Sequence, residues 1–226
     1  FEFALGLPWL TQYPLRHAVN TLLLQLEVAE PLLAQRWHRL ERVYERPEGH
    51  LYTASPREFA LKEDLGGLGE VIETLGIGCV MFDPWYLMHT GSEISSESVA
   101  PSLSAVNHLI YDYGVIAVIV AHEKKPAFDK GGGEFSQGLA AVSGHHNLTD
   151  WADTVAMISR TPNGIRVVWE KVRHASGLPR PLQLVWTPTI PFALADSKYA
   201  AAKEAVAYTR VSRILLDQGG SMPLPA

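Results

Sequence analysis

Cysteine is almost absent from this sequence, which contains only Cys79 among its 226 residues. A single cysteine cannot form an intramolecular disulfide, and it cannot build a cysteine-based metal site. Cys79 also lies inside the apolar run 77–82. The cysteine content therefore predicts a protein of a reducing cytoplasm.

Long apolar runs and an excess of positive charge are missing as well. No run approaches the roughly 18 apolar residues of a membrane span, and no signal-peptide pattern is present. The 19 Lys and Arg residues are outnumbered by 24 Asp and Glu residues, which gives a formal net charge of -5. A protein that coats nucleic acid through bulk electrostatics needs the opposite balance, so any nucleic-acid contact has to be local. We expect a soluble protein with no membrane partner.

Internal repeats and long linkers are also lacking. With 226 residues, 47% of them hydrophobic, the chain can bury one substantial core. We expect a core domain over residues 1–195 and a helical extension over 196–226, because the polar, Ala-rich stretch 196–208 is the only shift in composition. The chain starts in an apolar helical stretch without a capping residue, which predicts natural sequence upstream. The extension is expected to lead to a further module.

Short, dense apolar runs without polar alternation are the main structural signal. Runs of this kind, bounded by Gly, Pro or charge, are typical of strands buried on both faces of a parallel sheet. Helical candidates lie between them, at 31–45, 65–75 and 95–113. The alternation predicts an α/β fold, with a mostly parallel twisted sheet, helices on both faces, and an antiparallel pair at its edge formed by 165–169 and 182–186. The runs interpreted as buried strands are 21–26, 79–82, 116–121, 154–159 and 165–169.

Asp83 is the strongest local signal for chemistry. It ends the apolar run 79–82, and Pro84 then forces the chain to turn. Ligands of α/β sheets bind at the carboxyl ends of strands, and an Asp placed there can hold a water molecule of a nucleotide-bound magnesium ion. The alternative is an Asp that only initiates a turn.

Glu27 follows the run 21–26 and gives a second carboxylate. If the strands are parallel, Glu27 and Asp83 lie at the same edge of one sheet. One carboxylate can then hold a metal ion while the other polarises an attacking water, as hydrolysis of a phosphoanhydride requires. The alternative is a carboxylate favoured by the dipole of a following helix, since Glu30 and Pro31 come next.

His122 ends a third apolar run, and a glycine-rich segment at 130–138 follows it. A polar residue at this strand end can contact the terminal phosphate of a nucleotide, although many histidines at strand ends are only hydrogen-bonded boundary residues. Lys124, Lys125 and Lys130 lie at or near the start of the glycine-rich segment. We interpret them as contacts to nucleic-acid phosphates, with a solvated charged surface as the alternative.

Lys171 and Arg173 follow the apolar run 165–169 and lie on the same side of the chain if it stays extended. An Arg displayed in this way can reach a phosphate in a neighbouring subunit and neutralise charge in the transition state. The alternative is a surface ion pair with Glu170.

Taken in order, these segments resemble the RecA-like ATPase family, and within it the branch of hexameric helicases similar to plasmid RepA. The order of the segments is more specific than any one of them, and the resemblance covers residues 1–186. The segments that carry it are Leu7-Pro8-Trp9-Leu10, 22–27, 79–83, 118–122, 142–153 and 171–173.

The resemblance implies a RecA-like fold, ATP and Mg²⁺ as cofactors, single-stranded DNA as a partner, and a ring of six subunits. It also implies roles for residues at matching positions. Glu27 would activate water and Asp83 would hold magnesium through water. His122 would sense the γ-phosphate, and Lys171 and Arg173 would act across the ring interface.

One departure from the family is large, because the phosphate-binding motif G-x-x-x-x-G-K-S/T occurs nowhere in these 226 residues. Members of the family carry this motif just ahead of the helix that here begins at Phe1. Without its backbone amides and Lys, we expect this segment alone to bind ATP poorly. Two alternatives to a DNA motor stay open: a RecA-like regulatory ATPase that binds protein, and a noncatalytic scaffold with a degenerate nucleotide site.

Overall fold

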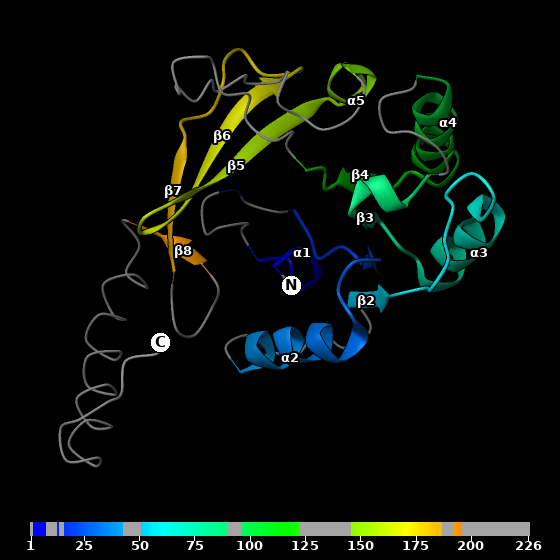
Figure 1. Cartoon of the computed structure of the whole chain (residues 1–226), viewed down its shortest axis with the longest axis horizontal. Helices are drawn as coiled ribbons and strands as arrows, with labels where there is room; N and C mark the ends of the chain where they lie inside the picture. Colours follow the sequence, from blue (N-terminus) through cyan, green and yellow to red (C-terminus); the bar gives the residue numbers. More distant parts are fainter. Residues whose placement is uncertain are drawn as a thin grey trace, which may run out of the picture. The chain divides into compact units, whose positions relative to one another are not determined.

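The computed structural model describes residues 2–7, 13, 16–42, 51–89, 96–122, 146–186 and 192–195 (Figure 1). The chain divides into two compact units, described here one at a time. The first contains residues Phe1–Val155 and Glu170–Leu178, and the second contains Ala156–Trp169 and Pro179–Ala226. The predicted extension 196–226 lies outside the described residues, so that assignment stays a prediction.

A four-stranded parallel sheet forms the centre of the first unit. Its order is β2-β1-β3-β4, and all three neighbouring pairs are parallel. Parallel strands need crossover connections, and helices supply them here, which confirms the predicted α/β fold of the RecA-like type. The strands are β1 (Thr21–Gln25), β2 (Leu51–Ala54), β3 (Cys79–Asp83) and β4 (Ile116–Ile119).

The helices of the first unit agree closely with the sequence pattern. The interval predicted at 65–75 is confirmed, and the helix ends because Gly76 takes a left-handed conformation with a φ of 59°. The helix predicted from 95 begins one residue later. The helix predicted at 31–45 begins one residue earlier and ends at Glu41, and residues 43–45 are not described. None of the described helices is both long and apolar enough to cross a membrane. They are α1 (Glu2–Leu5), α2 (Glu30–Glu41), α3 (Leu65–Leu75), the short 3-10 helix η1 (Trp85–Leu87), α4 (Ser96–Tyr113) and α5 (His146–Trp151).

The core of this unit lies between one face of the sheet and the helices α3 and α4. Alternate residues of β1 and β3 point into it, and Phe82 has no exposed surface. Burial of each such side chain stabilises the fold by about 1.5–3 kcal/mol. Because Phe82 is held in this way, the next residue, Asp83, is fixed at the end of β3. The core side chains from these four elements are Leu22, Leu24, Val80, Phe82, Leu68, Ile72, Val99, Leu103, Ala105, Val106 and Leu109.

The remaining strands form a separate four-stranded sheet of order β5-β6-β7-β8. The pairs β6–β7 and β7–β8 are antiparallel, as predicted for residues 165–169 and 182–186, but these strands form their own sheet and not an edge of the parallel one. Both β5 and β6 contribute residues to both units. The strands are β5 (Thr154–Thr161), β6 (Gly164–Val172), β7 (Leu182–Trp186) and β8 (Phe192–Leu194).

The strand predictions need correction in two respects. Residues 116–121, 154–159 and 165–169 were expected to be buried on both faces, but β4, β5 and β6 are mostly half-buried or exposed, and Ile116 and Ile158 keep 52% and 63% of their surface exposed. An apolar run alone does not distinguish a buried parallel strand from a partly solvated antiparallel one. The strand β2 was not predicted, because it is a short edge strand whose residues are half-buried or exposed.

Candidate functional site at the sheet edge

The carboxyl edge of the parallel sheet brings the predicted carboxylates together. In the register of β1 and β3, Gln25 lies opposite Asp83. The ladder continues one step further, since the Leu26 backbone N–H donates to the Asp83 carbonyl at 2.9 Å. Glu27 follows at once, so both carboxylates lie at one edge, as the sequence predicted from parallel pairing.

Asp83 is half-buried, and its Oδ2 accepts a hydrogen bond of 2.6 Å from Gln25 Nε2. Burial raises the pKa of the Asp83 carboxyl above its ordinary value, because a charged carboxylate loses hydration there. The Gln25 hydrogen bond lowers this pKa, the charge of Glu27 raises it, and His122 and Arg36 lower it. The effect of burial is the largest, so the pKa of Asp83 stays above its ordinary value in spite of these favourable partners.

Gln25 links the two carboxylate-bearing segments, a role that the sequence did not predict. Its Oε1 accepts hydrogen bonds from the backbone N–H groups of Glu27 and Val28, at 2.7 and 3.0 Å. Its Nε2 donates to Asp83. The signal in the sequence was a single amide at the end of an otherwise apolar strand, one position before Leu26.

His122 joins the same edge from β4. Its Nε2 lies 3.7 Å from Glu27 Oε2, and the two side chains are 57% and 49% exposed. The Tyr86 ring lies beside the imidazole, with ring centroids 5.6 Å apart. Backbone bonds hold the segment in place, because the Val120 N–H donates to the Phe82 carbonyl and the Val120 carbonyl accepts from Trp85. The structure therefore places His122 next to Glu27.

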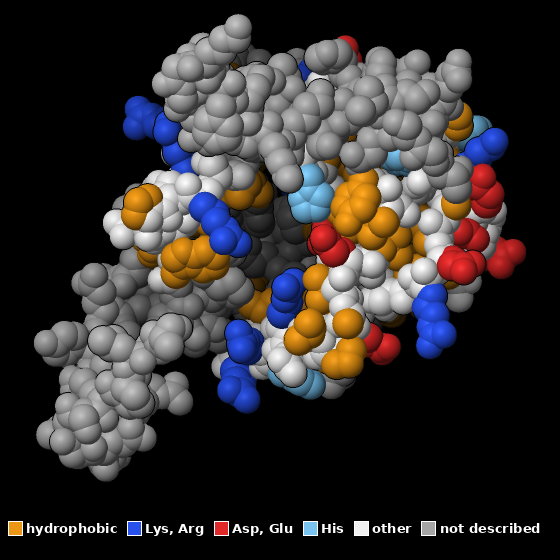
Figure 2. Space-filling model, viewed as in Figure 1, with side chains coloured by type: hydrophobic (Ala, Val, Ile, Leu, Met, Phe, Trp, Pro, Cys, Tyr) orange, Lys and Arg blue, Asp and Glu red, His pale blue; other side chains and the backbone are white. Residues whose placement is uncertain are grey.

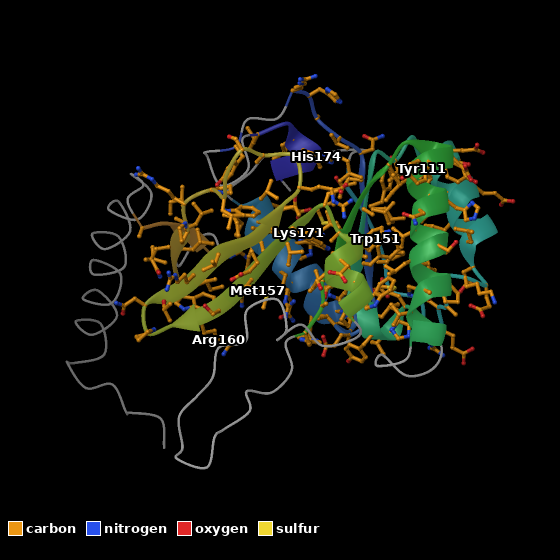
Figure 3. All side chains as sticks on the ribbon, turned by 90° about the horizontal axis from the view of Figure 1, so that it is seen from above. Tyr111, Trp151, Met157, Arg160, Lys171 and His174 are labelled. Carbon is orange, nitrogen blue, oxygen red and sulfur yellow. The ribbon has the colours of Figure 1, made fainter. Side chains whose placement is uncertain are left out.

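Lys171 lies elsewhere, at the C-terminal end of α5 (Figure 3). Arg173 binds the same end of this helix. Lys171 Nζ donates to the backbone carbonyls of Thr149 and Asp150, at 2.9 and 2.8 Å. Arg173 donates to the Asp150 carbonyl and pairs with the Asp153 carboxylate at 2.8 Å. Cations at the end of a helix satisfy its last carbonyls and favour its dipole. The ion pair of Arg173 is formed with Asp153, whereas the sequence suggested Glu170.

The three lysines proposed to contact DNA, Lys124, Lys125 and Lys130, lie outside the described residues. The described surface is acidic over α3 and α4, on the right of the space-filling view (Figure 2). Exposed carboxylates there come from Glu70, Glu73 and Asp112. This face does not favour a polyanionic partner.

An open pocket of about 710 Å³ adjoins the same edge of the sheet. Leu26 and Leu87 contribute to its wall next to the carboxylates, and the segment after β2 supplies most of the rest. Its volume is in the range of small-molecule sites. Its lining residues are Leu26, Arg57, Glu58, Phe59, Ala60, Asp64 and Leu87.

The carboxylate oxygens at this edge fit the magnesium ion of a magnesium nucleotide. Magnesium prefers oxygen ligands and keeps several of its waters, so one carboxylate with a second nearby suffices. Asp83 has one oxygen engaged by Gln25 and a second for a metal-bound water. Within the described ranges, no three His, Cys, Asp or Glu side chains gather into a fully protein-liganded metal site.

Comparison with known proteins gives one family. A family model described as an AAA domain matches residues 1–127, which is more than half of the chain. The match includes Gln25, Glu27, Asp83 and His122, and it ends before Lys171 and Arg173. No curated protein matches the sequence.

Proposed function

Because the chain belongs to the AAA-domain family, we propose that it is part of an ATP-dependent motor that acts on single-stranded DNA as a ring. Membership in this family indicates a nucleotide-dependent ATPase. The DNA-motor role goes beyond the family and rests on the resemblance to plasmid RepA helicases together with the arrangement at the sheet edge.

The observation that carries the proposal is the grouping of Asp83, Glu27 and His122 at one carboxyl edge, with Asp83 and the Glu27 backbone joined through Gln25. Magnesium ATP, when bound, would supply the phosphoanhydride and a cation that neutralises phosphate charge. Asp83 would hold a water of the metal ion. Glu27, half-exposed at the edge, would accept a proton from the attacking water.

His122 has a defined task in this proposal. Its imidazole lies 3.7 Å from the Glu27 carboxylate, so it stabilises the charged carboxylate when it is protonated. It also lies on the segment that leads from β4 to Lys124 and Lys125. A shift of His122 in response to the terminal phosphate would reach the lysines that we propose as DNA contacts.

Lys171 and Arg173 are proposed to act across a ring interface. In this structure they bind carbonyl oxygens of α5 and the Asp153 carboxylate. Arg173 keeps 45% of its side chain exposed, so solvent still reaches it. A phosphate on a neighbouring subunit would compete with these oxygens for the same donors.

The test is steady-state ATP hydrolysis by the full-length protein, with and without single-stranded DNA. Asp83→Asn removes the proposed metal-binding charge. Asp112→Asn removes an exposed carboxylate of α4 and serves as the matched control. The proposal predicts hydrolysis that rises with DNA, is lost in Asp83→Asn and is kept in Asp112→Asn.

Other outcomes reject the motor. Hydrolysis that does not respond to DNA would indicate a regulatory ATPase, which the acidic surface over α3 and α4 also favours. A folded full-length protein without hydrolysis would indicate a scaffold.

A further inference from the structure

Gln25 makes hydrogen bonds in two opposite directions. Its Oε1 accepts from the Glu27 and Val28 backbone N–H groups, and its Nε2 donates to Asp83 Oδ2 at 2.6 Å. Backbone N–H groups only donate, and an ionised carboxylate only accepts. The partners therefore fix which end of the amide faces which segment.

The amide is buried as well as fully oriented. Only 3% of the Gln25 surface is exposed, and the residue ends a strand whose other members are Thr21 and three leucines. A buried amide is costly unless it is hydrogen-bonded, so the position favours a glutamine only if the bonds are made. All three hydrogen bonds of the amide are made to groups outside β1, so they are not part of the pairing of the strand itself.

We propose that Gln25 is a positioning residue that ties the Glu27 backbone to the Asp83 carboxylate and so fixes the two acidic groups relative to each other. This inference rests on the proposed function, in which Asp83 holds the metal ion and Glu27 activates water. Gln25 itself would contact neither the metal ion nor the attacking water.

The donor arm orients the Asp83 carboxylate. With Oδ2 engaged by Gln25 Nε2 at 2.6 Å, the other carboxylate oxygen is the one left for a metal-bound water. Gln25 therefore holds the Asp83 carboxylate in one orientation.

The acceptor arm sets the position of Glu27. Residues 26–28 form a bend after β1, and the Gln25 oxygen binds two successive N–H groups of that bend. The Glu27 side chain is half-exposed, with His122 near its end. The position of the Glu27 side chain is therefore set through its backbone, which the Gln25 hydrogen bonds hold.

Substitutions separate the two arms. Gln25→Glu keeps oxygens for the Glu27 and Val28 amides but loses the donor to Asp83. Gln25→Met has a similar length and loses both arms. The double variant Gln25→Glu/Asp83→Asn exchanges carboxylate and amide, so the bond between positions 25 and 83 can form in the reverse direction. Gln183→Met removes an exposed amide from β7 and is the matched control.

The first readout needs no nucleotide. Hydrogen exchange at the Glu27 and Val28 amides reports the acceptor arm, and the carbon-13 chemical shift of the Asp83 carboxyl at neutral pH reports the donor arm. Loss of a hydrogen bond should speed exchange at these amides by about tenfold or more in Gln25→Met and leave it near wild type in Gln25→Glu. The carbon-13 shift of the Asp83 carboxyl should change in both variants, because both lose the donor to Oδ2. Unchanged exchange and an unchanged carboxyl shift in Gln25→Met would overturn the inference.

The second readout is hydrolysis by the full-length protein as a function of Mg²⁺. Gln25→Met should raise the Mg²⁺ concentration for half-maximal rate by about tenfold, because it loses one hydrogen bond to a charged group without a change of charge, and such a loss is of that order. Gln25→Met should also lower kcat at saturating Mg²⁺, since Glu27 is released. The double variant should regain stability, and its Glu27 and Val28 amides should exchange slowly again. It should not regain hydrolysis, because it lacks the Asp83 carboxylate.

The two readouts separate the two ideas. A wild-type protein without hydrolysis would reject the proposed function, while amide exchange and the carboxyl carbon-13 shift would still decide whether Gln25 fixes Glu27 and Asp83. An active wild type whose Gln25→Met variant keeps its kcat and its Mg²⁺ dependence would overturn the positioning role.

Discussion

Lys171→Met tests whether the contact with the end of α5 stabilises the fold. Methionine keeps most of the aliphatic stem and removes the ammonium group. In the native structure that group donates to the carbonyls of Thr149 and Asp150, at 2.9 and 2.8 Å. Both carbonyls belong to the last turn of α5, where no further helical N–H follows to bind them.

The expected loss follows from the two bonds. A hydrogen bond with a charged donor contributes about 1.5–3 kcal/mol when it is protected from water, and a cation at a helix C-terminus contributes about 0.3–1 kcal/mol. Lys171 is only half-buried, and the Asp150 side of its contact is exposed, so water recovers part of this energy. We predict that Lys171→Met lowers the free energy of unfolding by about 2 kcal/mol.

The measurement is urea unfolding followed by circular dichroism, with Arg166→Met as the control. Arg166 is an exposed cation on the same strand, and its loss should change stability by less than about 0.5 kcal/mol. If Lys171→Met is as stable as this control, the capping argument is refuted. The result also decides how a loss of hydrolysis in Lys171→Met is interpreted, because a destabilised variant loses activity without any ring contact.

Three further predictions concern other parts of the chain. Gly164→Ala should lower the free energy of unfolding in urea by about 3 kcal/mol or more, because Gly164 has a φ of 155° and an added Cβ would clash with the Leu184 carbonyl oxygen. Gly177→Ala, where the Cβ would enter open space, should be near neutral. Burial raises the pKa of the Cys79 thiol to about 11, so a disulfide reagent at pH 8 should label it only on unfolding, and rapid labelling of the native protein would contradict this. Burial raises the folded pKa of Asp83 above its ordinary value of 3.8, so ionisation of Asp83 removes stability as the pH rises through the folded pKa. Asp83→Asn should therefore gain urea stability relative to wild type as the pH rises above 3.8, and a difference that does not change with pH would refute this.

The parts of the fold that follow from local patterns could be predicted. The interval 65–75 is amphipathic and ends at Gly76, so both its type and its end are encoded nearby. The runs that became β1 and β3 are apolar and lie on either side of helices. The rule that such strands are parallel then places Glu27 and Asp83 at one edge.

Features that depend on distant partners could not be predicted. The strand β2 is recognisable only through its pairing with β1, because its own residues are partly exposed. The role of Gln25 depends on the register that places it opposite Asp83, and a glutamine at a strand end carries no local sign of this. The contact of Lys171 and Arg173 with α5 was equally hidden, since a helix of six residues gives too short a periodic signal.

The parallel topology of the sheet also determines the stage of synthesis and folding at which the site can form. Gln25 and Asp83 are 58 positions apart, and His122 follows β4, the last strand of this sheet to be synthesised. Contacts between such distant residues require long loops to close, so they form late compared with any helix. On a ribosome, Glu27 emerges long before its partners. Until residue 122 has been added and β4 has joined the sheet, a growing chain has no complete arrangement of Gln25, Asp83 and His122 at the sheet edge. The formation of this edge therefore indicates that the parallel sheet is complete.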